Sequence, residues 1–115
     1  MVFDTIKFRW YSAPQMKAIR LFHDKASLPD GSIVEMTIWR LPAAHPERLH
    51  GLKYRLYYGR AGERIVGYDN ERGKGDHKHI EGREVRYRFV SVEQLVADFL
   101  ADVERNRRHE SKQRE

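Results

Sequence analysis

The chain has 115 residues and a mass of 13.7 kDa, which is the size of one domain with its own hydrophobic core. It contains no cysteine, which excludes disulfides, thiolate-ligated metals and cysteine nucleophiles. The formal net charge is +5 and the sequence pI is near 9.6, and this balance favours a polyanionic partner such as nucleic acid. No apolar run approaches the roughly 18 residues of a membrane span, so we expect a cytoplasmic protein with no membrane contact.

The first predicted element is a β-hairpin. Two strand-like runs, residues 16–27 and 33–41, flank a turn of leucine, proline, aspartate, glycine and serine at residues 28–32. These residue types favour a tight turn between antiparallel strands. Because side chains alternate along a strand, the second run is apolar on the face of Val34, Met36 and Ile38 and mixed on the other.

More strands follow the proline-containing loop at residues 42–51. Residues 52–58 alternate cleanly between an apolar phase and a phase that carries Lys53, Arg55 and Tyr57. A further strand is predicted at residues 64–69, and after a loop through Gly82 the same alternation returns over residues 84–89. The second phase of these strands forms one face with the cations Lys53, Arg55, Arg86 and Arg88.

One helix is predicted near the C-terminus. Ser91 and Gln94 have the spacing of a capping box, and apolar residues then recur at helical spacing from Val92 to Val103. Such a stripe packs on the apolar face of a sheet and leaves the other face open. We therefore predict an α+β fold in a single domain, residues 1–115: a small antiparallel sheet, a helix on one face and a basic open face. The core spans about residues 16–104, and we expect the polar tail, residues 105–115, to fray.

The stretch from Tyr68 to His79 is the richest in chemical groups. Gly73 and Gly75 flank Lys74, so the backbone can turn its amides toward an anion beside an ammonium group. The loop lacks the pattern of a Walker loop. It is either a phosphate-binding loop or an ordinary glycine-rich connection.

His77 and His79 share one face if their segment is extended. Metal-independent RNA cleavage needs a general base, a general acid and cations near the phosphate, and histidine titrates in the useful range. We place these catalytic roles on His77, His79, Lys74 and Asp76, with Arg83 as a further cation. Alternatively, the two histidines are solvated side chains of a strand. A zinc or manganese site of the two histidines with Asp69 or Asp76 is a third interpretation, but no other ligand completes the set, so we expect no metal and no cofactor.

The second phase of the strands supplies the expected RNA contacts. Basic side chains bind phosphates, and an aromatic side chain among them can stack on a base. The predicted RNA-binding residues are Lys53, Arg55, Tyr57, Arg83, Arg86 and Arg88. His50, at the entry to the basic strand, and Asp69 are possible additions to the site.

Several segments together resemble the TumE family of small bacterial toxins. They are residues 30–42, His50, residues 53–55, the long stretch 68–79, and Asp98-Phe99 in the helix. The resemblance covers about residues 16–103, with Lys78 where we would expect arginine. It implies a toxin–antitoxin system whose antitoxin, TumA, carries a helix-turn-helix domain. No part of the resemblance extends to residues 1–15 or to the tail.

The combined hypothesis is a growth-inhibiting toxin that cleaves RNA as a metal-independent endoribonuclease, a hydrolase by class. The reaction itself is inferred from small size, the basic face and the histidines, by analogy with RelE-like toxins. The RNA substrate is either free or bound to the ribosome. The sequence leaves open whether the protein forms a homodimer. Two other functions stay open: a non-catalytic nucleic-acid or protein-binding module, and a metal-dependent nuclease.

Overall fold

The computed structural model describes residues 17–43, 48–71 and 73–114. Met16, the first residue of the predicted hairpin, and residues 44–47 of the predicted loop lie outside this range. No helix within it has the length and apolar character to cross a membrane.

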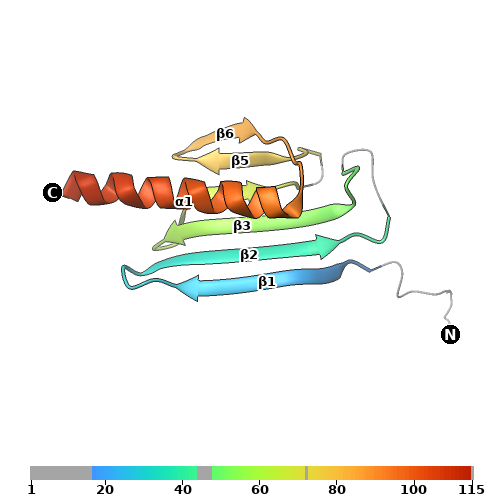
Figure 1. Ribbon diagram of the computed structural model, residues 1–115, viewed down its shortest axis with the longest axis horizontal. Helices are drawn as coiled ribbons and strands as arrows, with labels where there is room; N and C mark the ends of the chain where they lie inside the picture. Colours follow the sequence, from blue (N-terminus) through green and yellow to red (C-terminus); the bar gives the residue numbers. More distant parts are fainter. Residues whose placement is uncertain (1–16, 44–47, 72, 115) are drawn as a thin grey trace.

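Six antiparallel strands follow one another in a single sheet, in the order of the sequence (Figure 1). The strands are β1 (Ile19–Ser27), β2 (Ser32–Arg40), β3 (Leu52–Arg60), β4 (Glu63–Asp69), β5 (His77–Ile80) and β6 (Arg83–Arg86), and the helix α1 (Val92–Arg114) follows. The predicted α+β fold, an antiparallel sheet with a C-terminal helix on one face, is confirmed.

The β1–β2 turn forms where proline, aspartate and glycine predicted it. The N–H of Gly31 donates to the carbonyl of Leu28 at 2.9 Å, and Gly31 has a φ of +86° that favours glycine. The Asp30 carboxylate accepts from both the backbone N–H and the hydroxyl of Ser32, at 2.9 and 2.6 Å. Chiefly because of the bond from this hydroxyl, the pKa of Asp30 falls to about 2.

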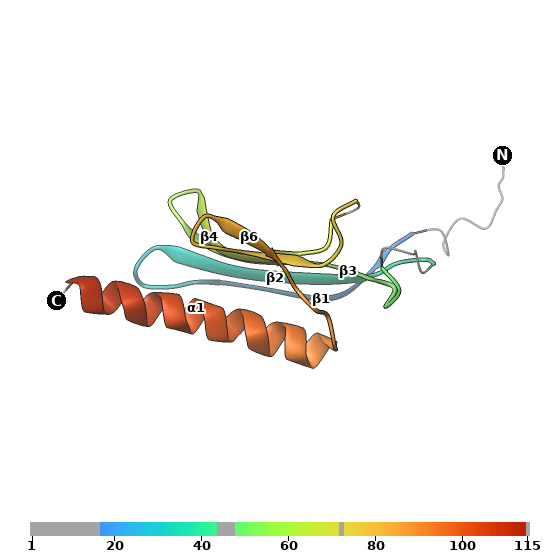
Figure 2. The same cartoon turned by 90° about the horizontal axis from the view of Figure 1, so that it is seen from above.

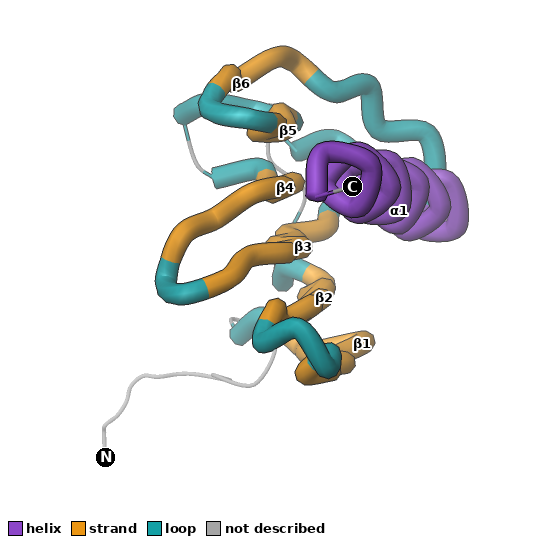
Figure 3. The backbone as a smooth tube through the Cα atoms, turned by 90° about the vertical axis from the view of Figure 1, so that its left-hand side faces the viewer, coloured by secondary structure: helices purple, strands orange, loops and turns teal. Residues whose placement is uncertain are grey.

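The helix lies along one face of the sheet, and no helix formed by the described residues lies on the other face (Figures 2 and 3). The core between them is built from the apolar phase of the middle strands and the apolar stripe of the helix. Its buried members are Met36, Ile38, Tyr54, Leu56, Tyr58, Val66, Tyr68, Leu95, Phe99 and Val103. We call this side of the sheet the covered face.

Tyrosine hydroxyls on the covered face are paired with aspartates. Tyr54 donates to Asp76 at 2.6 Å, Tyr87 donates to Asp98 at 2.7 Å, and Tyr68 donates to Asp102 of the helix. Burial first, and these carboxylates second, raise the pKa of all three tyrosines above the ordinary value. Each of these three hydroxyls thus keeps a hydrogen-bond partner where burial removes it from water.

The largest differences from the predicted strands concern β5 and β6. Residues 77–80, which we predicted within a loop, form β5, and the predicted strand 84–89 ends at Arg86. The glycine-containing turn at residues 81–82 joins β5 and β6 as a tight hairpin, with Gly82 at a φ of +80°. Tyr87 and Phe89 still pack against the core as the apolar phase predicted.

The helix begins at the predicted cap and runs further than predicted. The hydroxyl of Ser91 accepts from the N–H of Gln94 at 3.0 Å, whereas the Gln94 amide donates to Asp98 and does not complete the capping box. Past residue 104, where we expected a frayed tail, the helix continues to Arg114. There Glu110 accepts from Arg60 of β3 at 2.7 Å, and Arg107 donates to Asp30 at 3.2 Å.

The edge strand β1 is exposed along its whole length. The pairing of β1 with β2 shifts between Arg20 and Phe22, which is the signature of a β-bulge. Beside it, an apolar groove of about 580 Å³ separates β1 from the first turns of the helix. Leu21 and Phe22 both line this groove, opposite Val92 and Val96 of α1.

Candidate functional site

The sheet face turned away from α1, the open face, carries side chains in rows across the strands. Antiparallel pairing sets His23 beside Thr37, Thr37 beside Arg55, Arg55 beside Asp69, and Asp69 beside His77. Directly paired residues share a face. The row therefore joins the edge strand β1 to β5 across the whole open face.

Cations and carboxylates are interspersed on the open face. Strand register and side-chain contacts place there the cations Arg20, Lys25, Lys53, Arg55, Arg64 and Arg86 and the carboxylates Glu35, Asp69 and Glu84. Two cations lie near aromatic rings, with the Lys53 ammonium 5.4 Å from the Trp39 ring and the Arg55 guanidinium 5.7 Å from the Tyr57 ring. Both distances are within cation–π range.

The predicted RNA-binding residues divide between the two faces. Lys53, Arg55, Tyr57 and Arg86 lie on the open face. Arg83 does not, because it pairs with Ile80, whose side chain packs against the core of the covered face. Arg88 is exposed in the segment after β6.

His77 is enclosed by hydrogen-bond acceptors. Its Nδ1 lies 3.0 Å from the carbonyl oxygen of Gly75, and its Nε2 lies 3.0 Å from Glu84 Oε2 and 2.6 Å from Asp69 Oδ1. The contact with Asp69 is an ion-pair contact without hydrogen-bond alignment. The His77 side chain is 11% exposed. Both ring nitrogens therefore have acceptors as neighbours, and the ring links the Gly75 carbonyl to the carboxylates of Asp69 and Glu84.

His79 shares the open face with His77, because β5 is extended as the prediction required. It pairs with Gly67 on one side and Glu84 on the other. Its ring has no hydrogen bond or ion pair to the described residues. Of the predicted catalytic groups, His79 is the one whose ring nitrogens are free.

The glycine loop holds Lys74 near a carboxylate. Gly73 and Gly75 have φ values of +89° and +69°, as the loop prediction requires. The Lys74 ammonium lies 3.5 Å from Glu84 Oε2, and its backbone N–H donates to the carbonyl of Glu71. Glu84 thus supplies the anion that this loop holds, and a phosphate would have to displace it.

Asp76 lies apart from the His77 cluster. Its Oδ1 accepts from the Tyr54 hydroxyl at 2.6 Å and lies 3.2 Å from His50 Nε2, on the covered side of the sheet. The N–H of Leu52 donates to His50 Nδ1 at 3.1 Å, so Nε2 carries the ring proton and donates it to Asp76. Phe89 packs on the His50 ring at 4.1 Å. His50 and Asp76 therefore stabilise this end of the sheet through hydrogen bonds. Neither side chain makes a hydrogen bond or ion pair with His77 or His79.

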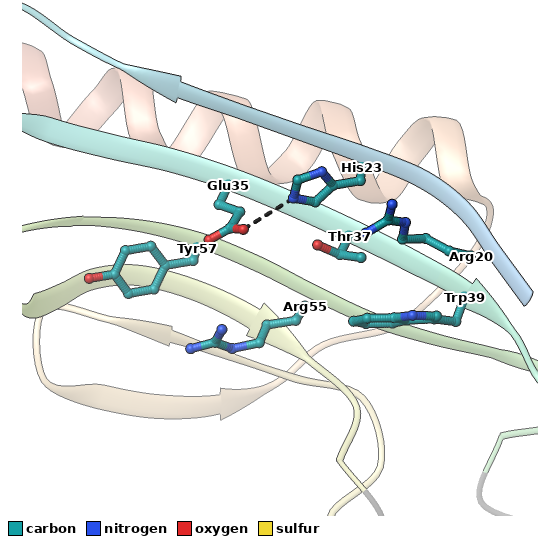
Figure 4. A pocket seen from close by; sticks show the side chains of 7 residues that line it. All are labelled: Arg20, His23, Glu35, Thr37, Trp39, Arg55 and Tyr57. Atoms are coloured by element: carbon teal, nitrogen blue, oxygen red, sulfur yellow. Dashed lines mark hydrogen bonds and ion pairs between the residues drawn. The ribbon is translucent and has the colours of Figure 1, made fainter. Parts of the chain in front are cut away.

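A hollow of about 280 Å³ over β1, β2 and β3 brings the predicted Arg55 and Tyr57 together with Arg20, His23 and Glu35, which the sequence prediction missed (Figure 4). It is lined by Arg20, His23, Glu35, Thr37, Trp39, Arg55 and Tyr57. In it, His23 Nε2 lies 3.1 Å from Glu35 Oε2. Alternation alone would put Arg20 and His23 on opposite faces, and the bulge between Arg20 and Phe22 brings them together. The alternation of β2 predicted that Glu35 lies on this face, but the sequence did not predict that His23 is its partner.

The surroundings of Glu35 lower the pKa of its carboxyl group. The hydrogen bond with His23 is the main cause that lowers the pKa of Glu35, against the opposing effect of burial, and the charges of Lys25 and Arg55 lower it further. No three His, Asp or Glu side chains within the described part of the chain are arranged to hold a metal ion.

Comparison with known proteins matches the chain to a family model. A family model described as "Toxin TumE" matches residues 13–107. No curated protein and no solved structure matches the chain. Because the match covers most of the sequence, the resemblance seen in the segments 30–42 and 68–79 is confirmed: the chain belongs to the TumE toxin family, and it is a toxin of a toxin–antitoxin system.

Proposed function

We propose that this toxin arrests growth by binding RNA on its open face and cleaving it without a metal ion. The observation that carries the proposal is the composition of that face: cations from several strands lie beside two aromatic rings, on the side of the sheet turned away from α1. Phosphates bind Lys and Arg, and unpaired bases stack on aromatic rings.

The pairing of cations with aromatic rings supports RNA over a simple acidic partner. Lys53 lies beside Trp39, and Arg55 lies beside Tyr57, on the neighbouring strands β2 and β3. A single-stranded RNA bound over β2 and β3 would meet a ring and a cation at each of these two pairs. This alternation suits a chain of bases and phosphates.

The reaction class follows from the histidines of the same face. Breaking an RNA phosphodiester bond needs a base for the 2′-hydroxyl proton and an acid for the leaving 5′-oxygen. His23 and His79 are the histidines of the open face whose surroundings leave them accessible, whereas His77 is enclosed. In this proposal His77 holds β5 and Asp69 in position. Lys74 pairs with Glu84, and Asp76 binds Tyr54 and His50, so both have structural roles.

Antitoxin binding completes the proposed role. Membership of a toxin family implies an antitoxin partner, and we propose that it is the helix-turn-helix protein TumA. Ribosome-bound RNA as substrate and a homodimer stay predictions from the sequence.

Charge reversal on matched positions tests the RNA interface. We would compare Lys53→Glu/Arg86→Glu with Arg83→Glu/Arg108→Glu, which makes the same charge change away from the open face. Binding of fluorescein-labelled single-stranded RNA is measured by anisotropy at several salt concentrations, and growth arrest is measured after induction. We expect the first pair to weaken binding at least about tenfold, to reduce the salt slope by roughly 1 to 1.5, and to abolish growth arrest.

The control pair is expected to stay within about twofold of the wild type in affinity. Equal loss in both pairs would indicate an unspecific effect of net charge and would contradict the assigned interface. RNA binding without any cleavage would favour the non-catalytic binding module, and cleavage that EDTA stops would favour the metal-dependent nuclease.

A further inference from the structure

The hollow on the open face brings together the groups that acid–base cleavage of RNA requires. We propose that this hollow is the cleavage site, with Glu35 as general base and His23 as general acid. The inference rests on the proposed function and adds to it the reacting groups, none of which lies in the histidine-rich loop.

The two titratable groups are paired and accessible. His23 Nε2 and Glu35 Oε2 lie 3.1 Å apart, and their side chains are 36% and 35% exposed. In contrast, the His77 side chain is 11% exposed and lies between two carboxylates. His23 and Glu35 come from the adjacent strands β1 and β2, so the sheet holds their backbones in fixed register.

Two arginines supply positive charge at the same place. Arg20 and Arg55 line the hollow on either side of the His23–Glu35 pair (Figure 4). The charge of Arg55 reaches the carboxylate, since it contributes to the lowered pKa of Glu35. Arginines placed around a phosphate stabilise the extra negative charge of a pentacoordinate transition state.

Aromatic rings close the two ends of the hollow. Trp39 lies at one end and Tyr57 at the other, with the titratable pair and Arg55 between them (Figure 4). Bases on both sides of the scissile phosphate could stack on these rings, which would align the phosphate with Glu35 and His23. An open surface hollow of this size fits a segment of a polymer better than an enclosed small molecule.

Glu35 and His23 together account for both proton transfers of the cleavage reaction. The Glu35 carboxylate takes the proton of the ribose 2′-hydroxyl, and O2′ forms a bond to phosphorus. The bond from phosphorus to O5′ breaks, and the leaving O5′ takes a proton from protonated His23. The products are a 2′,3′-cyclic phosphate and a free 5′-hydroxyl. The entering phosphate replaces the His23–Glu35 hydrogen bond, so that each group then faces its own oxygen.

The test compares variants of the hollow with variants of the histidine strand. His23→Ala and Glu35→Gln are the test variants, His79→Ala represents the rival site, and Asp24→Asn is the control. Asp24 is exposed on β1 and pairs with Met36, so it lies on the other face of the same strand. Purified full-length protein is incubated in EDTA with total RNA and a defined oligonucleotide, with and without ribosomes, while RNA affinity is measured in parallel.

We expect His23→Ala and Glu35→Gln to lower the cleavage rate at least about 100-fold, with RNA affinity within about threefold of the wild type. Asp24→Asn should cleave at the wild-type rate. Wild-type product ends should be 2′,3′-cyclic phosphate and 5′-hydroxyl. The wild-type cleavage rate should fall on both sides of a pH optimum. The step needs an ionised Glu35, which lies near the charges of Lys25 and Arg55, and a protonated His23.

Other outcomes separate this inference from the proposed function. Cleavage that persists in the hollow variants and disappears in His79→Ala would overturn the inference and leave the proposed function intact. RNA binding without cleavage under all these conditions, or cleavage that needs a metal ion, would also overturn it. If the wild type binds no RNA at all, the proposed function and the inference both fail.

Discussion

The covered and the open face of this sheet are built from the same strands and differ in how their polar groups are satisfied. On the covered face Tyr54, Tyr68 and Tyr87 each donate to an aspartate, and Lys78 lies 3.4 Å from Asp102. On the open face, by contrast, His79 has no partner within the described part of the chain.

The difference follows from the cost of burial. An unpaired polar group under the helix would lose its water without compensation, so the three tyrosine hydroxyls and Asp102 are paired there within the fold. A group on the open face keeps its water and can remain free for a ligand. The covered face should therefore control stability, and the open face should control activity.

The largest expected effect is the removal of a core side chain. Phe99 is fully buried and packs edge-on against Tyr68, with ring centroids 5.7 Å apart. Phe99→Ala should lower the free energy of unfolding by about 3–5 kcal/mol, whereas Tyr57→Ala on the open face should cost about 1 kcal/mol or less. Urea denaturation followed by circular dichroism measures both. Comparable losses would contradict the division between the faces.

The next effect concerns the carboxylate of Asp102, which is 6% exposed. Burial raises its pKa, but hydrogen bonds from Tyr68 and Arg105 and the charge of Lys78 outweigh burial and lower it. Asp102→Ala leaves Tyr68 and Lys78 without this partner and should cost about 2–4 kcal/mol. The exposed Glu104→Ala is the matched control on the same helix and should change stability by less than about 0.5 kcal/mol.

Alkaline pH should act through the covered tyrosines. Their pKa is raised in the folded state, so their contribution to stability is complete below the unfolded value near 10 and is lost as pH rises above it. We expect most of the tyrosinate absorbance to appear together with loss of the circular dichroism signal. Tyrosinate formation by all six tyrosines in a folded protein would contradict the paired arrangement.

The smallest of these effects is at the helix cap. Ser91 accepts from the N–H of Gln94, and Ser91→Ala should cost about 1 kcal/mol of unfolding free energy. Ser111→Ala, exposed near the other end of α1, is the control and should have almost no effect. Since neither serine lies on the open face, RNA binding should be unchanged in both variants.

The covered face could be predicted from the sequence because its signals are local. The alternation of residues 52–58 and the helical stripe from Val92 to Val103 each specify an apolar surface, and two such surfaces must pack together. The tail was different, since its polar residues have no apolar stripe. The helix there meets the β1–β2 turn and β3 through Arg107 and Glu110, and these contacts join residues distant in sequence.

The site was harder to predict, because it depends on register and on one irregularity. Asp76 adjoins His77 in sequence, but it binds Tyr54 and His50, which are 22 and 26 residues away. Arg83 and Arg86 lie on opposite faces because β6 begins at Arg83 and side chains alternate along a strand, whereas the predicted strand began only at residue 84. A bulge has no unique sequence signal, so Arg20 and His23 could be placed on one face only from the paired strands.

The most direct test of the open face as the RNA interface is a map of RNA contacts on the protein. Amide and indole chemical shifts of the ¹⁵N-labelled protein would be followed as a single-stranded RNA oligonucleotide is added. We expect the largest changes on β1 to β3, at Trp39, Lys53, Arg55 and Tyr57. Changes concentrated instead along the apolar groove of Leu21, Phe22 and Val96 would place the RNA on the other side of the sheet and contradict an RNA interface on the open face.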